Sequence, residues 1–130
     1  MSQKDLYTGC PVQHARKYIS GKWQIPILWY LKKQPSRFVE LKNILPGISE
    51  KVLTQELRFF EASGIIEKEV YTCIPPKVEY RLTSQGLTLI PVIQNIIQWG
   101  YSHLQEEKAN RSMRSTPVSI ITELEAINNA

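Results

Sequence analysis

The most informative stretch of the sequence is SEKVLTQELRFF, residues Ser49 to Phe60. It follows Pro46 and Gly47, which are expected to end the element before it. The Ser49 hydroxyl can accept a hydrogen bond from a free amide in a first helical turn, so a helix is expected to begin at this residue. At 100° per residue, one side of the helix is apolar, and it carries Leu53, Leu57 and Phe60 with Val52 at its edge.

The opposite side of this expected helix is polar, and it carries Lys51, Thr54, Gln55 and Arg58. An ammonium, a methyl-bearing hydroxyl, an amide and a guanidinium fork are groups that read base edges in a DNA major groove. A solvated helix face has the same composition and is the commoner explanation for a lone stretch of this kind. The neighbouring segments therefore decide between the two interpretations.

Three further helices are expected before this one, because apolar residues recur at spacings of three and four over residues 11–19, 22–33 and 38–45. Residues 34–36 are expected to form a turn between the second and third of them. Two short helices joined by a tight turn that contains glycine form a helix-turn-helix, and residues 38–45 and 49–60 fit that arrangement.

After Gly64 the apolar period changes from 3.6 to 2, which predicts strands over residues 65–72 and 77–82. The two strands would form a hairpin directly behind the helix-turn-helix, where a winged-helix domain has its wing. The expected fold class is therefore α+β and mainly α, a winged helix-turn-helix with a two-stranded wing.

Thr83 is expected to cap a long helix over residues 84–108, whose apolar residues form two stripes. One stripe consists of Ile90, Ile93, Ile97, Gly100 and Leu104, and the other of Leu89, Val92, Ile96 and Trp99. A domain of this size cannot easily cover both stripes, so a second copy of the chain is expected to cover one. A helix buried within its own core would show the same pattern. The expected homodimer interface, built from the N- and C-terminal helices, consists of Val12, Ile19, Val92, Ile96 and Trp99.

The composition is that of one soluble globular domain, with 130 residues of which 42% are hydrophobic and 22% charged. Lys and Arg exceed Asp and Glu by 12 to 7 in residues 16–82, so the excess positive charge lies around the polar helix face. A membrane span and a signal peptide are not recognisable, which predicts a cytoplasmic protein. We expect a flexible N-terminus over residues 1–9, the winged-helix domain with its dimerisation helices over 10–107, and a linker with a weak C-terminal helix over 108–130.

Enzymatic function has little support in the sequence, which has no phosphate loop, HExxH motif or nucleophile elbow. We therefore expect neither a catalytic residue nor a cofactor, and a small catalytic thiol protein is the rival from the enzyme class. Cys10 and His14 are four residues apart and could both ligate a metal. Two ligands do not make a metal site, so no metal is expected.

Short motifs along the chain add to this pattern, namely Cys10-Pro11, Gly21-Lys22-Trp23, Arg37-Phe38, Gly47-Ile48-Ser49, Pro75-Pro76-Lys77-Val78-Glu79-Tyr80 and Trp99-Gly100. In this order, over residues 10 to 104, they resemble the HxlR-type family of bacterial winged-helix regulators, which are MarR-like. The resemblance implies a homodimeric transcription factor whose Ser49 helix enters the major groove and whose wing contacts adjacent DNA backbone. Phe59 departs from the family pattern, in which a polar residue is usual, and we expect it to pack against the wing or a partner subunit.

The double-stranded DNA partner is expected to be contacted by two groups of side chains. Base contacts are expected from Ser49, Lys51, Thr54, Gln55 and Arg58. Backbone contacts are expected from Arg37, Lys42, Lys68 and Lys77. The operator should be an inverted repeat with half-site centres roughly 34–36 Å apart. The alternative is a winged helix that has lost DNA binding and uses its basic face on an acidic protein.

The resemblance further implies a redox or electrophile sensor at Cys10, because several relatives are regulated through an N-terminal cysteine at this position. At a helix start, free amides and the charges of Arg16 and Lys17 favour a thiolate, and the polar residues 1–9 are not expected to shield it well. The expected effectors are oxidants, quinones or other electrophiles, with Cys73 as a candidate resolving thiol across the dimer. A buried, inert Cys10, with control by a small-molecule ligand instead, is the alternative.

Overall fold

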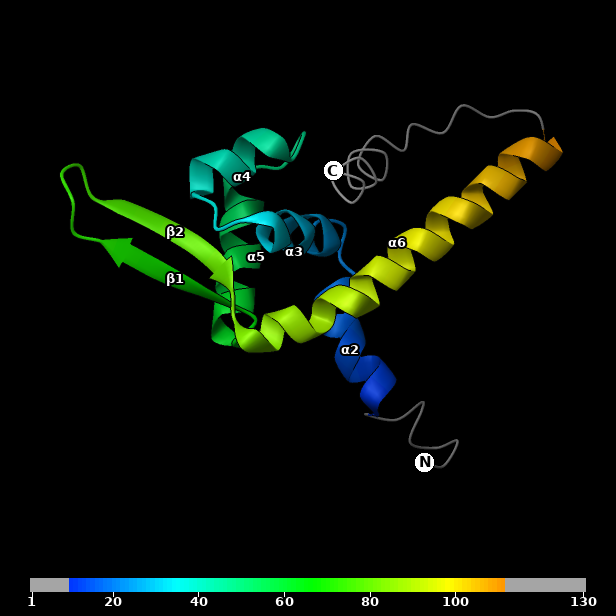
Figure 1. Ribbon diagram of the computed structural model, residues 1–130, viewed down its shortest axis with the longest axis horizontal. Helices are drawn as coiled ribbons and strands as arrows, with labels where there is room; N and C mark the ends of the chain where they lie inside the picture. The colour runs from blue at the N-terminus through cyan, green and yellow to red at the C-terminus, as the bar shows by residue number, and fades with distance from the viewer. Residues whose placement is uncertain (1–9, 112–130) are drawn as a thin grey trace. The chain divides into compact units, whose positions relative to one another are not determined.

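The computed structural model describes residues 10–111 of the chain. In this range the elements follow in the order α2 (Pro11–Ile19), α3 (Gln24–Lys33), α4 (Phe38–Ile44), α5 (Glu50–Ala62), β1 (Ile66–Tyr71), β2 (Lys77–Leu82) and α6 (Ser84–Arg111) (Figure 1). This mainly helical order, with an antiparallel pair directly behind α4 and α5, confirms the expected winged helix-turn-helix. A boundary between two compact units falls inside α6, between Leu87 and Thr88, so the two are described separately.

The ends of the domain differ in part from the expectation. Helix α6 continues through Lys108 to Arg111, where the sequence predicted a linker from residue 108 onward. The expected flexible N-terminus and the expected weak C-terminal helix lie outside the described residues. Within residues 10–111, no helix combines the length and the apolar character that crossing a membrane requires.

The core of the first unit is built on α3, which is buried on nearly every side. Pro26 and all the residues from Ile27 to Leu31 are buried, and Trp29 is 0% exposed. Helical periodicity did not single out Trp29, because a helix that is apolar all round has no polar face to mark its orientation. Gln24, the buried polar residue at its start, accepts a hydrogen bond from the Gly21 amide at 2.7 Å and donates one to the Lys17 carbonyl at 2.6 Å. These bonds join the end of α2 to α3.

The turn between α4 and α5 has the geometry that its sequence predicts. Gly47 adopts φ +85°, a left-handed conformation that glycine reaches without a Cβ penalty. The Ser49 hydroxyl accepts a hydrogen bond from the Val52 amide at 3.1 Å, which confirms Ser49 as the residue that caps α5. Leu45 and Ile48 are buried on either side of Gly47, so the turn is held by apolar packing at both ends.

The hairpin pairs Ile66 with Leu82 at its base and Tyr71 with Lys77 at its far end. A third segment joins it, because Ser36 forms two backbone hydrogen bonds with Tyr80, at 2.9 and 2.8 Å. The sequence predicted only a turn at residues 34–36. A single bridging residue is too short to give an alternating apolar pattern, and this bridge fixes β2 to the segment that leads into α4.

The base of the hairpin is locked to the end of α5. The Thr83 hydroxyl accepts a hydrogen bond from the Gly86 amide at 3.0 Å, which caps α6 as expected, and donates one to the Gly64 carbonyl at 2.5 Å. Gly86 is buried, and a Cβ there would fall on the Ile65 carbonyl oxygen. The first turn of α6 therefore needs glycine at this point to approach the α5–β1 corner so closely.

The second unit contains α6 from Thr88 onward, and its two apolar stripes differ in exposure. Ile90 and Ile93 in the first stripe are buried. In the second stripe Val92 and Ile96 are exposed, and Trp99 is 70% exposed. The Trp99 ring stacks on His103 with the ring centroids 4.9 Å apart. Val92, Ile96 and Trp99 of the second stripe therefore form an apolar surface that the described part of the chain leaves exposed.

Candidate nucleic-acid interface

The polar face of α5 lies in solvent, as its sequence predicts. Leu53, Leu57 and Phe60 are buried on the opposite face of the helix. The polar face, hereafter the reading face, has exposed side chains at Ser49, Lys51, Gln55 and Arg58 and a half-buried one at Thr54. Neither Lys51 nor Arg58 forms an ion pair with any residue in the range 10–111. Both cations of the reading face are therefore available to a ligand.

Glu56 is the acidic residue of α5 whose surroundings affect its ionisation. It is half-buried, and burial raises the pKa of its carboxyl above the ordinary value for glutamate. The raised pKa means that the charged form is disfavoured at this position.

The hairpin register separates the two lysines that were expected to contact DNA backbone. Successive residues of a strand point to opposite faces, so Lys68 shares a face with Val70 and with its cross-strand partner Tyr80. Lys77 lies on the other face. Lys68 is exposed and has no ion pair among residues 10–111. The two lysines therefore cannot contact the same stretch of phosphates in the same way.

The face that holds Lys77, hereafter the charged face, neutralises its own charges. Arg81 forms ion pairs with Glu67, at 3.2 Å, and with Glu69. Lys77 Nζ lies 3.9 Å from a Glu79 oxygen and 4.9 Å from the centroid of the Tyr71 ring. A hydrogen bond to Glu79 raises the pKa of the Tyr71 hydroxyl, with smaller contributions from burial and from the Glu79 charge. Three carboxylates face two cations here, so the charged face has no positive surplus to offer a phosphate.

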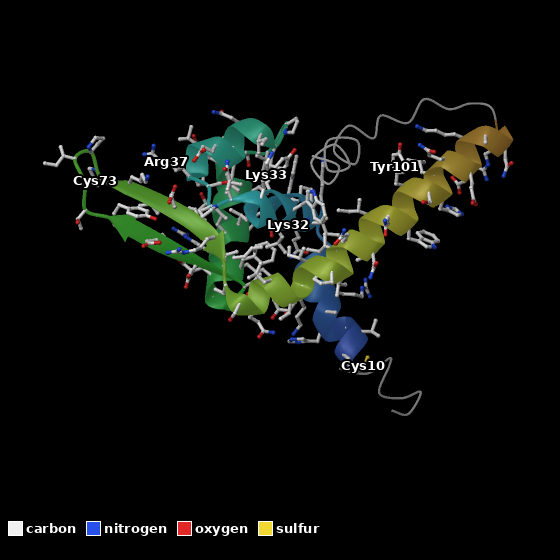
Figure 2. All side chains as sticks on the ribbon, in the orientation of Figure 1. Cys10, Lys32, Lys33, Arg37, Cys73 and Tyr101 are labelled. Atoms are coloured by element: carbon white, nitrogen blue, oxygen red, sulfur yellow. The ribbon has the colours of Figure 1, made fainter. Side chains whose placement is uncertain are left out.

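Arg37 and Lys42 belong to the segment around α4. Arg37 is exposed at the start of the helix, and its backbone amide donates a hydrogen bond to Glu40 Oε1 at 2.8 Å. An open groove separates the first turn of α4 from the start of β2, and it is lined by Arg37, Phe38, Val39, Glu40, Lys77, Val78 and Glu79. Figure 2 shows Arg37 at the end of α4 that faces the hairpin. Lys42 is half-buried within the same helix.

Cys10 lies at the residue before α2, where its carbonyl accepts a hydrogen bond from the His14 amide at 3.1 Å. The expectation that its thiol is poorly shielded is wrong, because Cys10 is 5% exposed. The sequence showed only the polar residues before it and not the packing around α2. Cys73 is exposed at the tip of the hairpin, and Figure 2 shows the two cysteines at opposite ends of the first unit. Within one chain they are not placed to react with each other.

An aromatic chain joins α2 to α5, and the sequence did not predict it. The ring centroids of His14 and Tyr18 are 5.5 Å apart, and those of Tyr18 and Phe59 are 5.4 Å apart. Phe59 also contacts Phe60 in the core, with centroids 5.5 Å apart. Phe59 therefore packs against α2 of its own chain, where the wing or a partner subunit had been expected. The signal was its departure from the pattern, but sequence alone did not identify the contact.

A metal site requires several ligand side chains that lie close together. Among residues 10–111, no three or more His, Cys, Asp or Glu side chains gather closely enough to hold a metal ion. His14, which could have joined Cys10 as a ligand, is instead packed edge-on against Tyr18. The exposed groups are suited to recognising a nucleic acid, which offers phosphates to cations and base edges to hydrogen-bonding side chains.

Known proteins similar to this chain agree with the geometry. Residues 18–108 match the family described as HxlR-like helix-turn-helix, a range that begins after Cys10. The HTH-type transcriptional regulator YkvN of Bacillus subtilis is 41% identical over 100 residues, which is 77% of this chain and 85% of that protein. The solved structure of the redox regulator HypR in its reduced form is 38% identical, with a TM-score of 0.71, over 76% of this chain and 98% of HypR. The diamide-treated YodB from B. subtilis is 32% identical, with a TM-score of 0.64, over 74% of this chain and 96% of YodB.

Proposed function

The chain belongs to the HxlR-like helix-turn-helix family of transcriptional regulators, and we propose that it binds an inverted-repeat operator as a homodimer in the cytoplasm. The observation that carries this proposal is the reading face of α5. Its cations are exposed and unpaired among the described residues, and its apolar face fixes the helix to the core. A major groove is wide enough to admit an α-helix, and a helix held in this way can present its polar side to the base edges there.

Base contacts are assigned to the reading face, with Ser49, Lys51, Thr54, Gln55 and Arg58 in the groove. Backbone contacts are assigned to Arg37, Lys42 and Lys68, which are exposed or half-buried without an ion pair among the described residues. Lys77 keeps a minor backbone role, because Glu79 already offsets part of its charge. Arg58, Gln55 and Lys51 therefore carry sequence preference, whereas the second group sets register and salt dependence.

The homodimer is proposed to form through apolar side chains of the terminal helices, which are the exposed Val12, Val92, Ile96 and Trp99 and the half-buried Ile19. Trp99 is the largest of them and is mostly in solvent, as an interface residue of a separated subunit would be. Trp99→Ala or Ile96→Asp should give a monomer by sedimentation that binds operator poorly, because the avidity of two half-sites is lost. A variant that stays dimeric would place these residues outside the interface.

Control by an oxidant or an electrophile such as a quinone is proposed to act at Cys10. Support comes from the likeness to the redox regulator HypR, which is solved in both oxidised and reduced forms, and to YodB, solved after diamide treatment. Because Cys10 is buried, its reaction requires a local opening at the start of α2. The contact between Tyr18 and Phe59 then gives α2 a direct packing connection to α5.

The proposed function is tested by recovering genomic fragments that bind the protein and then titrating the recovered operator with and without diamide. We expect an inverted repeat, and release of the wild-type protein by diamide at a dose that leaves Cys10→Ser bound. Phe59→Gln should also respond weakly, because it removes the aromatic contact with α2. Equal release of wild type and Cys10→Ser would remove Cys10 from the mechanism. Failure to enrich any sequence would contradict operator binding itself.

A further inference from the structure

The tip of the hairpin is an uncharged and fully exposed loop. It consists of Thr72, Cys73, Ile74, Pro75 and Pro76, and each of these residues is exposed. The Ile74 side chain is 100% exposed, so none of its surface is covered by the described part of its own chain. A large apolar residue in this state loses the free energy of burial unless something else covers it.

The loop is organised to present Ile74 outward. The Cys73 thiol donates a hydrogen bond to the Pro75 carbonyl, with sulfur and oxygen 3.1 Å apart. This bond links the two residues on either side of Ile74. Pro75 and Pro76 have no amide hydrogen and a fixed φ, so the far side of the loop is stiff and offers no backbone donor. The tip is therefore a blunt apolar wedge that needs little ordering before it binds.

Charges near the tip do not equip it to grip phosphates. Lys77, the nearest cation in the sequence, faces Glu79 and the Tyr71 ring. Lys68 is set back along β1, opposite Tyr80. Glu79 and Glu69 are in turn paired with Lys77 and Arg81, so the tip also lacks a free carboxylate that would be repelled by DNA.

The position of the tip relative to the reading face is set by the fold. The Thr83 and Gly64 hydrogen bond ties the base of the hairpin to the end of α5, and the two bonds between Ser36 and Tyr80 tie β2 to the start of α4. Figure 1 shows the hairpin projecting beyond α4 and α5 within the first unit. The hairpin therefore projects beside the reading helix, and the groove that adjoins an occupied major groove along a duplex is a minor groove.

We propose that Ile74, supported by Pro75 and Pro76, enters the minor groove beside each half-site as an apolar wedge and confers a preference for an easily unstacked A·T step there. Isoleucine and proline are among the side chains that wedge between base steps in minor grooves. Pyrimidine–purine steps such as TA unstack with the least cost, so a sequence preference arises without a hydrogen bond to a base. This inference rests on the proposed operator binding and adds a second specificity element to it.

The test uses the recovered operator with three versions of the flanking step: A·T, G·C and inosine·C. Inosine presents the major-groove pattern of guanine but lacks the amino group that guanine places in the minor groove. Wild-type protein should bind the A·T and inosine·C flanks alike and the G·C flank about fivefold or more weakly, as expected for one unfavourable base pair. A thymine at the step should become more reactive to permanganate on binding, because permanganate oxidises thymine that has lost its stacking.

Ile74→Ser should lose the flank preference and the rise in permanganate reactivity while keeping the salt dependence of binding, because no charge is removed. Val70→Ser is the matched control, since Val70 is 59% exposed but belongs to β1 and not to the tip loop, and it should behave as wild type. The proposal is overturned if the inosine·C flank behaves as G·C or if Ile74→Ser keeps the preference. It is also overturned if Ile74→Ser changes the sedimentation of the free protein, because the tip would then contact a second copy of the chain. Binding with no flank effect refutes the wedge alone, whereas the absence of specific binding to any duplex refutes operator binding as well.

Discussion

Helix α5 and the β1–β2 hairpin both bring cations to the surface, but among residues 10–111 α5 leaves both of its cations unpaired, whereas the hairpin leaves only Lys68 unpaired. Lys51 and Arg58 have no carboxylate partner among residues 10–111, whereas Arg81 and Lys77 of the hairpin contact glutamates on the same face. The difference arises because the apolar and polar residues of α5 are segregated by helical period. In the hairpin, antiparallel pairing places Glu67 directly across from Arg81, and strand alternation brings Glu69, Lys77 and Glu79 to the same face. The number of cations in a segment therefore says less about DNA binding than the pairing of those cations.

The largest expected effect concerns the buried side of α5. Phe60→Ala should lower the free energy of unfolding by about 3–5 kcal/mol, because a fully buried aromatic side chain is lost and leaves a cavity. Val70→Ala in the hairpin should change it by no more than about 0.5 kcal/mol, since Val70 is exposed. Urea unfolding followed by circular dichroism measures both. Similar losses from the two variants would mean that the hairpin is as much a part of the core as α5 is.

A smaller effect is expected on operator affinity from Arg58→Ala. The loss of a bidentate base contact should cost about 1–3 kcal/mol and relax the preference at one base position. Arg81→Ala is the matched control from the hairpin, and it should leave both affinity and preference nearly unchanged because Glu67 and Glu69 already hold its guanidinium. Fluorescence anisotropy with labelled operator variants measures both quantities. A larger loss from Arg81→Ala than from Arg58→Ala would reverse the comparison between the two elements.

The two hairpin lysines give a finer comparison within one element. Lys68→Ala should lower the slope of log affinity against log salt by about 0.9, the value for one lost phosphate contact. Lys77→Ala should change the slope much less, because Glu79 and Tyr71 already contact its ammonium group. Titrations at four or five salt concentrations give the slopes. Equal reductions would show that the Glu79 contact does not persist in the DNA complex.

The smallest effect expected is a pH-dependent one at Glu56 of α5. Burial raises its folded-state pKa above the unfolded value, so folding takes up a proton in the window between the two values. The free energy of unfolding therefore falls as pH rises through that window and stays lower above it. Glu56→Gln should be more stable than wild type at neutral pH, with the difference vanishing below both pKa values. Urea midpoints across this pH range measure the difference, and a variant that is less stable at neutral pH would show that the carboxylate is favoured in the fold.

The sequence predicted the features that depend on local order. The helix cap at Ser49, the glycine turn at Gly47, the cap at Thr83 and the two strands were all expected where they occur, because each depends on residues close in the chain. The separation of Lys68 from Lys77 also follows from strand alternation once the register is known. Register itself is a tertiary property, so the sequence alone could not assign the two lysines to different faces.

Features that depend on contacts between distant segments were not predicted. Cys10 is buried although polar residues precede it, since the packing that covers it is not visible in its neighbours in sequence. Phe59 contacts Tyr18, which lies in the helix before α3, and no periodicity connects these two positions. The bridge between Ser36 and Tyr80 involves one residue on each side, which is too little for any pattern.

The most direct test of DNA reading by α5 is a double-mutant cycle between Arg58 and one base. The operator is made with a 7-deazapurine, which lacks the N7 acceptor of the major groove, at the position whose preference Arg58→Ala relaxes. If the reading face lies in the major groove, this change should cost wild type about 1–3 kcal/mol of binding and cost Arg58→Ala nothing further. An equal cost in both proteins, or no cost in either, would contradict the assignment of α5 as the reading helix.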